Sequence, residues 1–517
     1  MWPRASVTPS GSATRCCAGH RSACRCWASL PRIDLGQGGA GCPARCWRHG
    51  HVLSHRWRPG WTFDPDLLRR HDRPGPRYTS YPTAPHFHDG FDAPALRQAI
   101  ADSNQLARAL SLYVHVPFCS SPCFYCGCNR VISRDRGRGH SYVARVLAEA
   151  DLLAPQFEDG REVIQLHLGG GTPNFLDAEA MTTLVEGLRR RFDFSDSAQR
   201  DFSIELDPRF IDTRDVAMLA RLGFNRASLG VQDFDPQVQE SINRVQGVQQ
   251  TLDILRSCRD SGMRSVNVDL IYGLPGQSLE GFGRTLELVL ALRPDRLAVY
   301  GYAHLPHLFR AQKQIDERSL PSPEDKLALL GLAVEKLSAA GYQYIGMDHF
   351  ALPEEDLSRA QRAGQLHRNF MGYTTHADTD LLGLGVSAIS HIGATYSQNP
   401  RDLPSWEDAV DQGQLPVWRG VALSADDQLR AELIQQLMCQ GEVDGTALGQ
   451  RHGVDFEQYF AEDLRSVQRL QEDGLAEYRD GVVRASEPGR PLLRLLAMCF
   501  DPYLRAAHEQ PRYSRAI

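Results

Sequence analysis

The stretch Leu112-Tyr-Val-His-Val-Pro-Phe-Cys119-Ser-Ser-Pro-Cys123-Phe-Tyr-Cys126 joins an apolar, β-branched run to three closely spaced cysteines. The run Leu112 to Val116 predicts a buried strand, and the cysteines follow it in the spacing C-x3-C-x2-C. Three thiolates can each bind one iron of a 4Fe-4S cluster, which leaves the fourth iron without a protein ligand. A cluster used only for electron transfer normally has four cysteine ligands, so this spacing favours a cluster with one open iron.

Two other interpretations of the triplet stay open at this point. A zinc site needs a fourth ligand, which Cys128 or a histidine can supply. Structural thiols or a disulfide are the third possibility, and a disulfide requires an oxidising compartment. Spacing favours the iron-sulfur interpretation over both.

The chain after the first strand alternates between short β-branched runs and helical patterns, which indicates a parallel sheet with right-handed crossovers. We expect strands at 112–116, 163–168, 202–206, 227–231, 266–271 and 297–302. We expect helices at 141–154, 177–191, 213–222, 236–242, 248–262, 279–292 and 323–340. Six strand-helix units predict an α/β fold in the form of an incomplete (β/α)6 barrel. A further run at 342–346 extends or flanks the sheet.

The pattern divides the chain into four parts. Residues 61–110 are expected to pack on the barrel, with helices at 61–70 and 92–110. Residues 111–402 form the barrel domain. Residues 403–517 read as a mostly helical C-terminal domain, with helices at 424–440, 444–451, 455–474 and 488–506 around a hairpin at 475–485.

The first 60 residues differ in composition from the rest of the chain. They contain nine arginines, one acid and six of the 13 cysteines, without apolar periodicity. We interpret them as a disordered extension or as upstream sequence translated from too early a start. A transit peptide is the second interpretation, and a metal or disulfide module is a weaker one because no cysteine spacing fits.

Composition excludes some classes of protein. A chain of 517 residues with 42% apolar content can bury a substantial core. Its net charge of −6 argues against a nucleic-acid-binding surface. No uninterrupted apolar run approaches the length of a membrane span.

Polar residues and glycines gather where the predicted strands end, which is the edge at which parallel α/β barrels bind ligands. Gly169, Gly170 and Gly171 precede Thr172 after the second strand, and such a loop lets the backbone approach a ligand closely. The later strand ends carry Glu205, Gln232, Asp269 and Ala303, and Arg244 lies a short way beyond the fourth strand. A mid-strand acid such as Asp269 needs a partner if it is buried.

Ten motifs that occur in order resemble one family. They are Arg77-Tyr-Thr-Ser-Tyr-Pro-Thr-Ala84, Val114-His-Val-Pro-Phe-Cys119, Cys126-Gly-Cys-Asn129, Gly169-Gly-Gly-Thr-Pro173, Val231-Gln-Asp-Phe234, Asp269-Leu-Ile-Tyr-Gly-Leu-Pro275, Tyr302-Ala-His-Leu-Pro306, Gly346-Met-Asp-His-Phe350, Leu366-His-Arg-Asn-Phe370 and Gly383-Leu-Gly-Val-Ser-Ala-Ile-Ser390. From about residue 62 to the C-terminus the chain resembles the oxygen-independent coproporphyrinogen III oxidases (dehydrogenases) of the radical S-adenosylmethionine (SAM) superfamily.

The resemblance implies a radical-SAM barrel, a 4Fe-4S cluster on Cys119, Cys123 and Cys126, and two bound SAM molecules. The catalytic residues it implies are these cysteines and Tyr113. It implies that the first SAM contacts Tyr113, the glycines of 169–171, Glu205 and Ile389. It implies that the second SAM contacts Tyr125, Gly171, Thr172, Gln232, Arg244, Asp269 and Ala303. Cys128 lies near the cluster without binding it.

The implied reaction converts two propionates of coproporphyrinogen III to vinyl groups through an adenosyl radical, giving protoporphyrinogen IX. His367 and Arg368 are the candidate propionate contacts, with His304 and His349 behind them; each can instead be a packed structural residue. The C-terminal domain and residues 513–517 are expected to help close the site against water. A haem-binding chaperone on the same scaffold is the alternative.

The resemblance and the chemistry also suggest the enzyme's partners. We expect a one-electron donor protein such as flavodoxin or ferredoxin, an unidentified electron acceptor and a monomeric chain. An oxygen-labile cluster with thiolate ligands favours a reducing cytoplasm.

Overall fold

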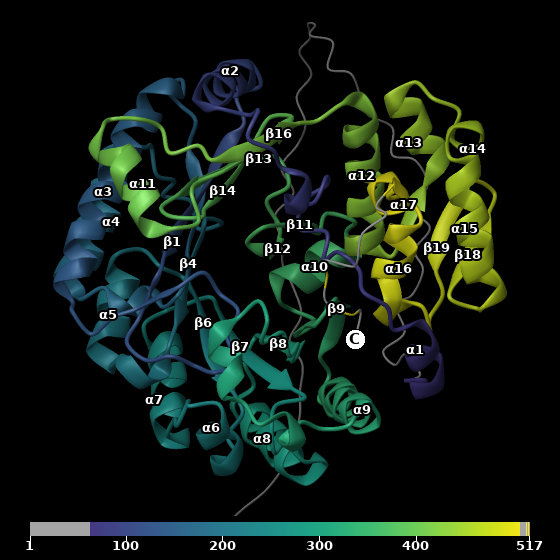
Figure 1. The fold of residues 1–517 in the computed structure, drawn as a ribbon, viewed down its shortest axis with the longest axis horizontal. Coiled ribbons are helices and arrows are strands. Elements are labelled where there is room, and N and C mark those ends of the chain that lie inside the picture. Colours follow the sequence, from purple (N-terminus) through teal and green to yellow (C-terminus); the bar gives the residue numbers. More distant parts are fainter. Residues whose placement is uncertain (1–62, 507–512, 514, 516–517) are drawn as a thin grey trace, which may run out of the picture. The chain divides into compact units, whose positions relative to one another are not determined.

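The computed structural model describes residues 63–506, 513 and 515 (Figure 1). The predictions for residues 1–60 therefore lie outside the described residues. The centre of the fold is a run of parallel strands in the predicted order, each hydrogen-bonded to the next. They are β1 (Ala109–Val116), β4 (Val163–Gly170), β5 (Asp201–Leu206), β6 (Arg226–Gln232), β7 (Ser265–Tyr272) and β8 (Arg296–Gly301). The prediction of an incomplete parallel barrel is confirmed.

Helices connect these strands and cover the outside of the sheet (Figure 1). They are α3 (Gly137–Leu153), α4 (Ala178–Arg189), α5 (Thr213–Arg221), α6 (Pro236–Ser241), α7 (Val248–Asp260), α8 (Leu279–Leu292) and α9 (Pro323–Ala339). Side-chain caps fix several of their starts: Asp177, Asp212 and Ser278 each accept a hydrogen bond from a backbone amide in the first helical turn. The apolar faces of these helices and the strands form one continuous core.

The sheet extends beyond the six predicted strands at both edges. β13 (Thr379–Leu384) pairs in parallel with β1 and adds a seventh parallel strand, followed by antiparallel β14 (Ile389–Ile392), β15 (Thr395–Gln398) and β16 (Arg419–Ala422). At the other edge β10 (His349–Ala351) and β9 (Gln343–Gly346) pair antiparallel with β8 and with each other. The sheet holds 12 strands in the part of the chain that is described.

Some predicted boundaries were wrong. The helix expected at 92–110 is α2 (Ala93–Asn104), because residues from Ala109 pair with β13 instead. The helix expected at 455–474 breaks into α14 (Phe456–Tyr459) and α15 (Ala461–Glu472). The helix expected at 488–506 breaks into α16 (Leu493–Met498) and α17 (Pro502–Ala506), since Pro502 has no amide to continue the helix.

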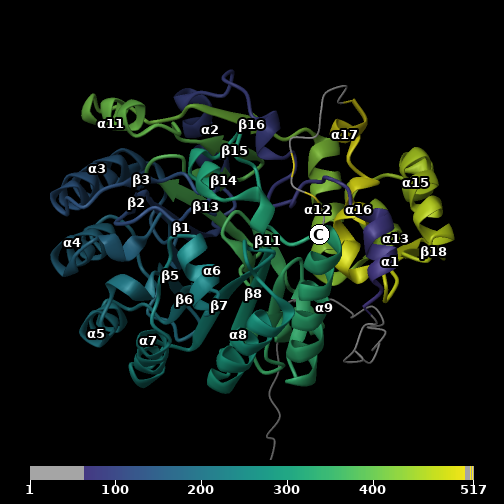
Figure 2. The same cartoon turned by 60° about the horizontal axis from the view of Figure 1, so that its bottom comes forward.

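The C-terminal helices form a second core. It is built on α12 (Ala425–Gln440), α13 (Gly445–His452), α14, α15 and α16, with a small sheet of β17 (Glu442–Asp444), β18 (Ala476–Arg479) and β19 (Val482–Ala485). Figure 2 shows these helices gathered together, with α1 (Pro65–His71) beside them. The leucines of α1 belong to this second core, whereas Leu96 and Ile100 of α2 belong to the first.

Residues 403–422 lie with the sheet and not with the C-terminal helices. α11 (Leu403–Asp411) packs on α3, and its Trp406 is fully buried in the first core. β16 is the last strand of the main sheet. The sequence pattern changes near residue 403, but the C-terminal helices of the second core begin only at α12.

Candidate functional site

The three cysteines lie in the loop after β1, at the carboxyl end of the parallel strands. They line a cavity of about 280 Å³. Most of the residues predicted for the site line the same cavity: Tyr125, Gly170, Gly171, Thr172, Glu205, Gln232, Arg244 and Asp269. Apart from Tyr125 and Arg244, which lie in loops, these residues come from β4, β5, β6 and β7 or directly follow them, so the parallel sheet brings together residues far apart in sequence.

Each cysteine sulfur accepts a hydrogen bond from the surrounding protein. The Thr172 hydroxyl donates to Cys119 Sγ at 3.3 Å, and the Cys128 amide donates to Cys126 Sγ at 3.4 Å. Two guanidinium groups, those of Arg209 and Arg244, donate to Cys123 Sγ at 3.4 and 3.5 Å. Hydrogen bonds to sulfur and nearby positive charge favour the thiolate form that a metal needs.

A buried ion cluster supports Cys123, and sequence reasoning missed two of its three members. Asp207 accepts from Arg244 at 3.0 Å and from Arg209 at 2.7 Å. Burial raises the pKa of the Asp207 carboxyl, but the two arginines outweigh it and hold that pKa below its ordinary value. The signal was present in the sequence, because Asp207-Pro208-Arg209 directly follows the β5 strand.

The glycine loop touches the cysteine loop without any room for a side chain. A Cβ on Gly171 would lie 2.6 Å from the Pro117 carbonyl oxygen, and the Gly171 amide donates to the Val116 carbonyl at 2.8 Å. Gly170 has φ of +111°, a conformation that favours glycine, and its amide donates to Glu205 Oε2 at 3.1 Å. The loop therefore fixes the cysteines and Glu205 relative to β4.

Glu205 and Asp269 stand in different electrostatic surroundings within one cavity. Burial raises the pKa of Glu205, but the interactions with His167 and the Gly170 amide lower it by more. The net pKa is therefore below its ordinary value, and the carboxyl is ionised. Burial raises the pKa of Asp269 to about 6, although hydrogen bonds from Ser228 at 2.9 Å and Asn267 at 2.8 Å oppose that rise. Both carboxylates retain oxygen lone pairs for hydroxyl or ammonium donors.

Four of the predicted SAM contacts do not line the cysteine cavity. Tyr113 lies behind it, with its ring stacked 5.9 Å from His167 and its hydroxyl 3.0 Å from His115 Nδ1. Gly169 precedes the loop, and a Cβ there would meet the Glu205 carboxylate at 3.1 Å. Ala303 lines a separate cavity, together with His304, and Ile389 opens β14.

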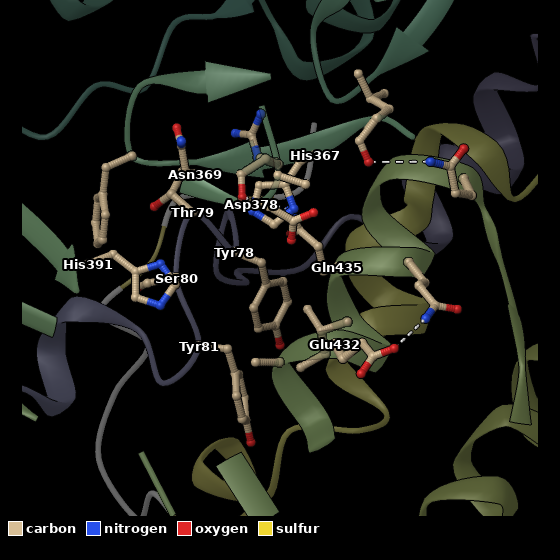
Figure 3. Close-up of a pocket in the computed structure, with 18 of the residues that line it drawn as sticks. Tyr78, Thr79, Ser80, Tyr81, His367, Asn369, Asp378, His391, Glu432 and Gln435 are labelled. Atoms are coloured by element: carbon tan, nitrogen blue, oxygen red, sulfur yellow. Dashed lines mark hydrogen bonds between the residues drawn. The ribbon is translucent and has the colours of Figure 1, made fainter. Parts of the chain in front are cut away.

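His367 and Arg368 line a different and larger cavity of about 440 Å³, between the sheet and α12. Figure 3 shows His367, Asp378 and His391 on one side of it and Glu432 and Gln435 on the other. Arg368 is 5% exposed; its Nε donates to the Arg77 carbonyl at 3.3 Å, and its Nη1 is a buried donor without a partner among the described residues. His349 lines a fourth cavity, inside the barrel.

The residues around the cysteines fit an iron-sulfur cluster better than a single ion. In the described part of the chain, no group of three His, Cys, Asp or Glu side chains converges closely enough to hold one metal ion. A zinc ion needs its ligands about 2.0–2.3 Å from a common centre, whereas a cubane cluster takes one thiolate per iron. The three thiols are free, and Arg244 Nε and Arg130 Nε beside them are buried donors without partners in the described structure.

Comparison with known proteins gives consistent findings over almost the whole described chain. The model of the radical SAM superfamily matches residues 113–289, and the model of the HemN C-terminal domain matches residues 423–492. An oxygen-independent coproporphyrinogen III oxidase from Pseudomonas aeruginosa is 47% identical over 455 residues, which are 88% of this chain and 99% of that protein. The one from Escherichia coli K12 is 45% identical and covers 88% and 98%.

A solved structure agrees with the sequence relatives. The coproporphyrinogen III oxidase (HemN) from Escherichia coli, titled a radical SAM enzyme, superposes with a TM-score of 0.82 at 44% sequence identity. The match covers 86% of this chain and 99% of that structure. No helix among the described residues has the length and apolar character needed to cross a membrane.

Proposed function

The chain belongs to the family of oxygen-independent coproporphyrinogen III oxidases, radical SAM enzymes of haem biosynthesis, and from that premise we propose which of its residues carry the reaction. The enzyme oxidatively decarboxylates two propionates of coproporphyrinogen III to vinyl groups, which gives protoporphyrinogen IX. The observation that carries the assignment of residues is the cavity that brings the free thiols of Cys119, Cys123, Cys126 and Cys128 together with Glu205 and Asp269. A haem chaperone without this activity is disfavoured, because the relatives are named as oxidases.

Cys119, Cys123 and Cys126 would hold the 4Fe-4S cluster. When bound, the cluster supplies the electron that cleaves SAM to the radical which abstracts a propionate hydrogen. The protein contributes the positions of the three thiolates and the hydrogen bonds to their sulfurs from Thr172, Arg209 and Arg244. Cys128 donates its backbone amide to Cys126 Sγ, and we do not assign its own thiol as a ligand.

Two SAM molecules would lie along the strand ends. The first would contact Tyr113, the glycines 169–171, Glu205 and Ile389, and the second Tyr125, Gly171, Thr172, Gln232, Arg244, Asp269 and Ala303. The charges of these residues suit SAM. The Arg244 guanidinium can pair with the methionine carboxylate, and the carboxylates of Glu205 and Asp269 can accept hydrogen bonds from the ammonium group or the ribose hydroxyls. The glycine loop presents backbone amides at close range, since no side chain fits at Gly171.

The substrate has four propionates and needs cationic or hydrogen-bonding partners. We assign His367 and Arg368 to propionate contacts on the side of the barrel that faces α12. The unpartnered Nη1 of Arg368 supports that assignment, because a buried guanidinium donor is costly without an acceptor. The C-terminal domain would help to exclude water from the radical intermediate.

We further propose a monomer that works in a reducing cytoplasm with a one-electron donor such as flavodoxin or ferredoxin. The electron donor and the electron acceptor are separate molecules, because the cysteine triplet provides ligands for one cluster. Free cysteines throughout the described chain, including buried Cys258, Cys439 and Cys499, suit a compartment that keeps thiols reduced.

An anaerobic assay tests the proposal. The reconstituted protein is mixed with dithionite, SAM and coproporphyrinogen III, and the products are oxidised and separated. We expect protoporphyrin together with cleaved SAM, and Cys123→Ala should abolish both. Cleaved SAM without vinyl products would point to another substrate, and absence of an iron-sulfur chromophore would refute the cofactor assignment.

A further inference from the structure

A second cavity beside the cysteine cavity is strongly cationic. It measures about 300 Å³, and among the described residues that line it are Arg77, Lys326, Arg494 and Arg515 against a single carboxylate, Asp348. Basic side chains therefore outnumber acidic ones among these lining residues, although two of the arginines have carboxylate partners. Confined positive charge of this kind favours the binding of an anion.

The arginines of this cavity are already oriented by the protein. Arg77 forms an ion pair with Asp348, and Arg515 forms one with Asp72 at 3.1 Å. Arg494 donates from Nη1 to the Gly75 carbonyl and from Nη2 to the Arg515 carbonyl, each at 3.0 Å. These carbonyl acceptors fix the Arg494 guanidinium in place.

Lys326 is the member without an anionic partner. In the described structure its ammonium makes no hydrogen bond or ion pair, and it lies 5.8 Å from the centroid of the Tyr272 ring. Burial lowers the pKa of this lysine, while the fields of Asp72 and Asp348 oppose the shift. It also stands in the first turn of α9, where the helix dipole favours negative charge. A buried ammonium in this position, without an acceptor among the described residues, is suited to bind an anion.

The cationic cavity and the cysteine cavity share a wall. Tyr300 of β8 lines the cysteine cavity, and the guanidinium of Arg77, which lines the cationic cavity, lies 5.8 Å from the centroid of the Tyr300 ring. Tyr272 and Gly301, the last residues of β7 and β8, line the cationic cavity directly. A ligand with several carboxylates can therefore place one in each cavity.

We propose that this cationic cavity, with Lys326 as its free donor, binds a non-reacting propionate carboxylate of coproporphyrinogen III while another propionate reacts at the cysteine cavity. The inference rests on the proposed function. Only two of the four propionates react, so at every stage at least two carboxylates must be held without being consumed. A buried carboxylate is stable only when it is paired, and an ammonium with three free donors provides that pair.

The binding of coproporphyrin III, the oxidised and fluorescent form of the substrate, tests the site without turnover. We compare the wild-type holoenzyme with Lys326→Gln, which removes the charge, and Lys326→Arg, which keeps it. Lys313→Gln is the matched control, since that lysine is exposed and outside the cavity. We expect Lys326→Gln to weaken the dissociation constant about tenfold or more, as loss of a charge-assisted hydrogen bond implies. Lys326→Arg should recover most of the affinity, and the control should leave it unchanged.

Steady-state kinetics identify which carboxylate the cavity binds. We expect Lys326→Gln to raise the KM for coproporphyrinogen III and leave the KM for SAM within twofold. A raised KM for SAM with unchanged porphyrin affinity would assign the cavity to the methionine carboxylate of SAM and overturn the proposal. Unchanged values for both would overturn it as well. Wild-type protein that binds coproporphyrin III but forms no vinyl product would refute the proposed function and not the site.

Discussion

The Arg244 guanidinium lies 3.5 Å from the Cys123 sulfur and is held there by an ion pair with Asp207 at 3.0 Å. Arg209 contacts the same two residues, Cys123 at 3.4 Å and Asp207 at 2.7 Å. One carboxylate thus positions two positive charges on a single thiolate. This arrangement places two guanidinium groups beside the Cys123 sulfur, so their charge contributes to the electrostatic field at the proposed cluster.

The charge of Arg209 should raise the reduction potential of the cluster. Positive charge and hydrogen bonds at a cluster sulfur stabilise the reduced form. We expect Arg209→Gln to bind a full cluster but to shift its midpoint potential to a more negative value, measured by potentiometry with electron paramagnetic resonance. Arg214→Gln is the control, because that arginine is 91% exposed and pairs with Asp212 on the surface. An unchanged potential in Arg209→Gln would contradict the prediction.

Gly171 should be intolerant of even one methyl group. The atoms that a Cβ would meet are the backbone oxygens of Pro117 and Phe118 at 2.6 and 2.9 Å, which cannot rotate away. We expect Gly171→Ala to displace the cysteine loop and to lose iron and sulfide, measured by chemical analysis after anaerobic reconstitution. Gly283→Ala provides the contrast, since a Cβ there meets only ordinary contacts at 3.7 Å within α8. That substitution should stabilise the helix by up to about 1 kcal/mol. Equal iron content in the two variants would show that the loop is not fixed by this contact.

The number of cysteine ligands can be measured by comparing two neighbouring cysteines. Cys128 contacts Cys126 through its backbone amide, which a serine retains. We therefore expect Cys128→Ser to keep the visible spectrum and iron content of the wild-type protein, and Cys126→Ser to lose them. A Cys128→Ser protein without a cluster would mean that Cys128 is a fourth ligand, and the iron would then not be open for SAM.

Much of this site could be predicted from sequence because parallel strands bring their carboxyl ends to one edge. Once Glu205, Gln232 and Asp269 are assigned to strand ends, their meeting follows from topology, and the structure places all three on the cysteine cavity. The site residues that were not predicted lie in loops and turns and not in the strands. Arg209 comes from a short 3-10 turn after β5, and Arg130 lies in the loop after the cysteines, where no periodicity marks it.

Contacts between residues far apart in sequence also explain the errors in the predicted fold. β13 reads Thr379-Asp-Leu-Leu-Gly-Leu384, and its glycine and acid obscure the strand pattern. Asp380 is tolerated because Arg161 and Ser103 bind it in the interior. Long-range pairs of this kind decide the edge of the sheet, and they are not visible in the local pattern. Similarly, the end of α2 depends on the pairing of Ala109 with Thr379, some 270 residues away in sequence.

Glu149 should make the stability of the fold depend on pH. It lies in α3 with 1% of its surface exposed and accepts hydrogen bonds from the Asn399 amide at 2.7 Å, the Gly385 amide at 2.8 Å and the Trp406 indole at 3.1 Å. Burial raises the pKa of its carboxyl from 4.5 to about 7, and these hydrogen bonds oppose that rise. Between these values the folded state holds a proton that the unfolded state has released, so stability falls as pH rises from about 4.5 to about 7 and is then constant.

The shift corresponds to about 3 kcal/mol of unfolding free energy across that window. Glu149→Gln removes the titration and loses one hydrogen bond, since an amide group replaces the oxygen that faces Asn399. The lost bond costs about 1 kcal/mol at every pH, whereas the titration acts only in the window. Relative to wild type, the variant should therefore gain stability steadily between pH 5 and pH 7 in urea denaturation followed by circular dichroism. Glu280→Gln, at an 88% exposed position, should follow the wild-type curve. A Glu149→Gln curve parallel to wild type would mean that Glu149 is ionised in the folded protein across this range, stabilised by the three donors around it.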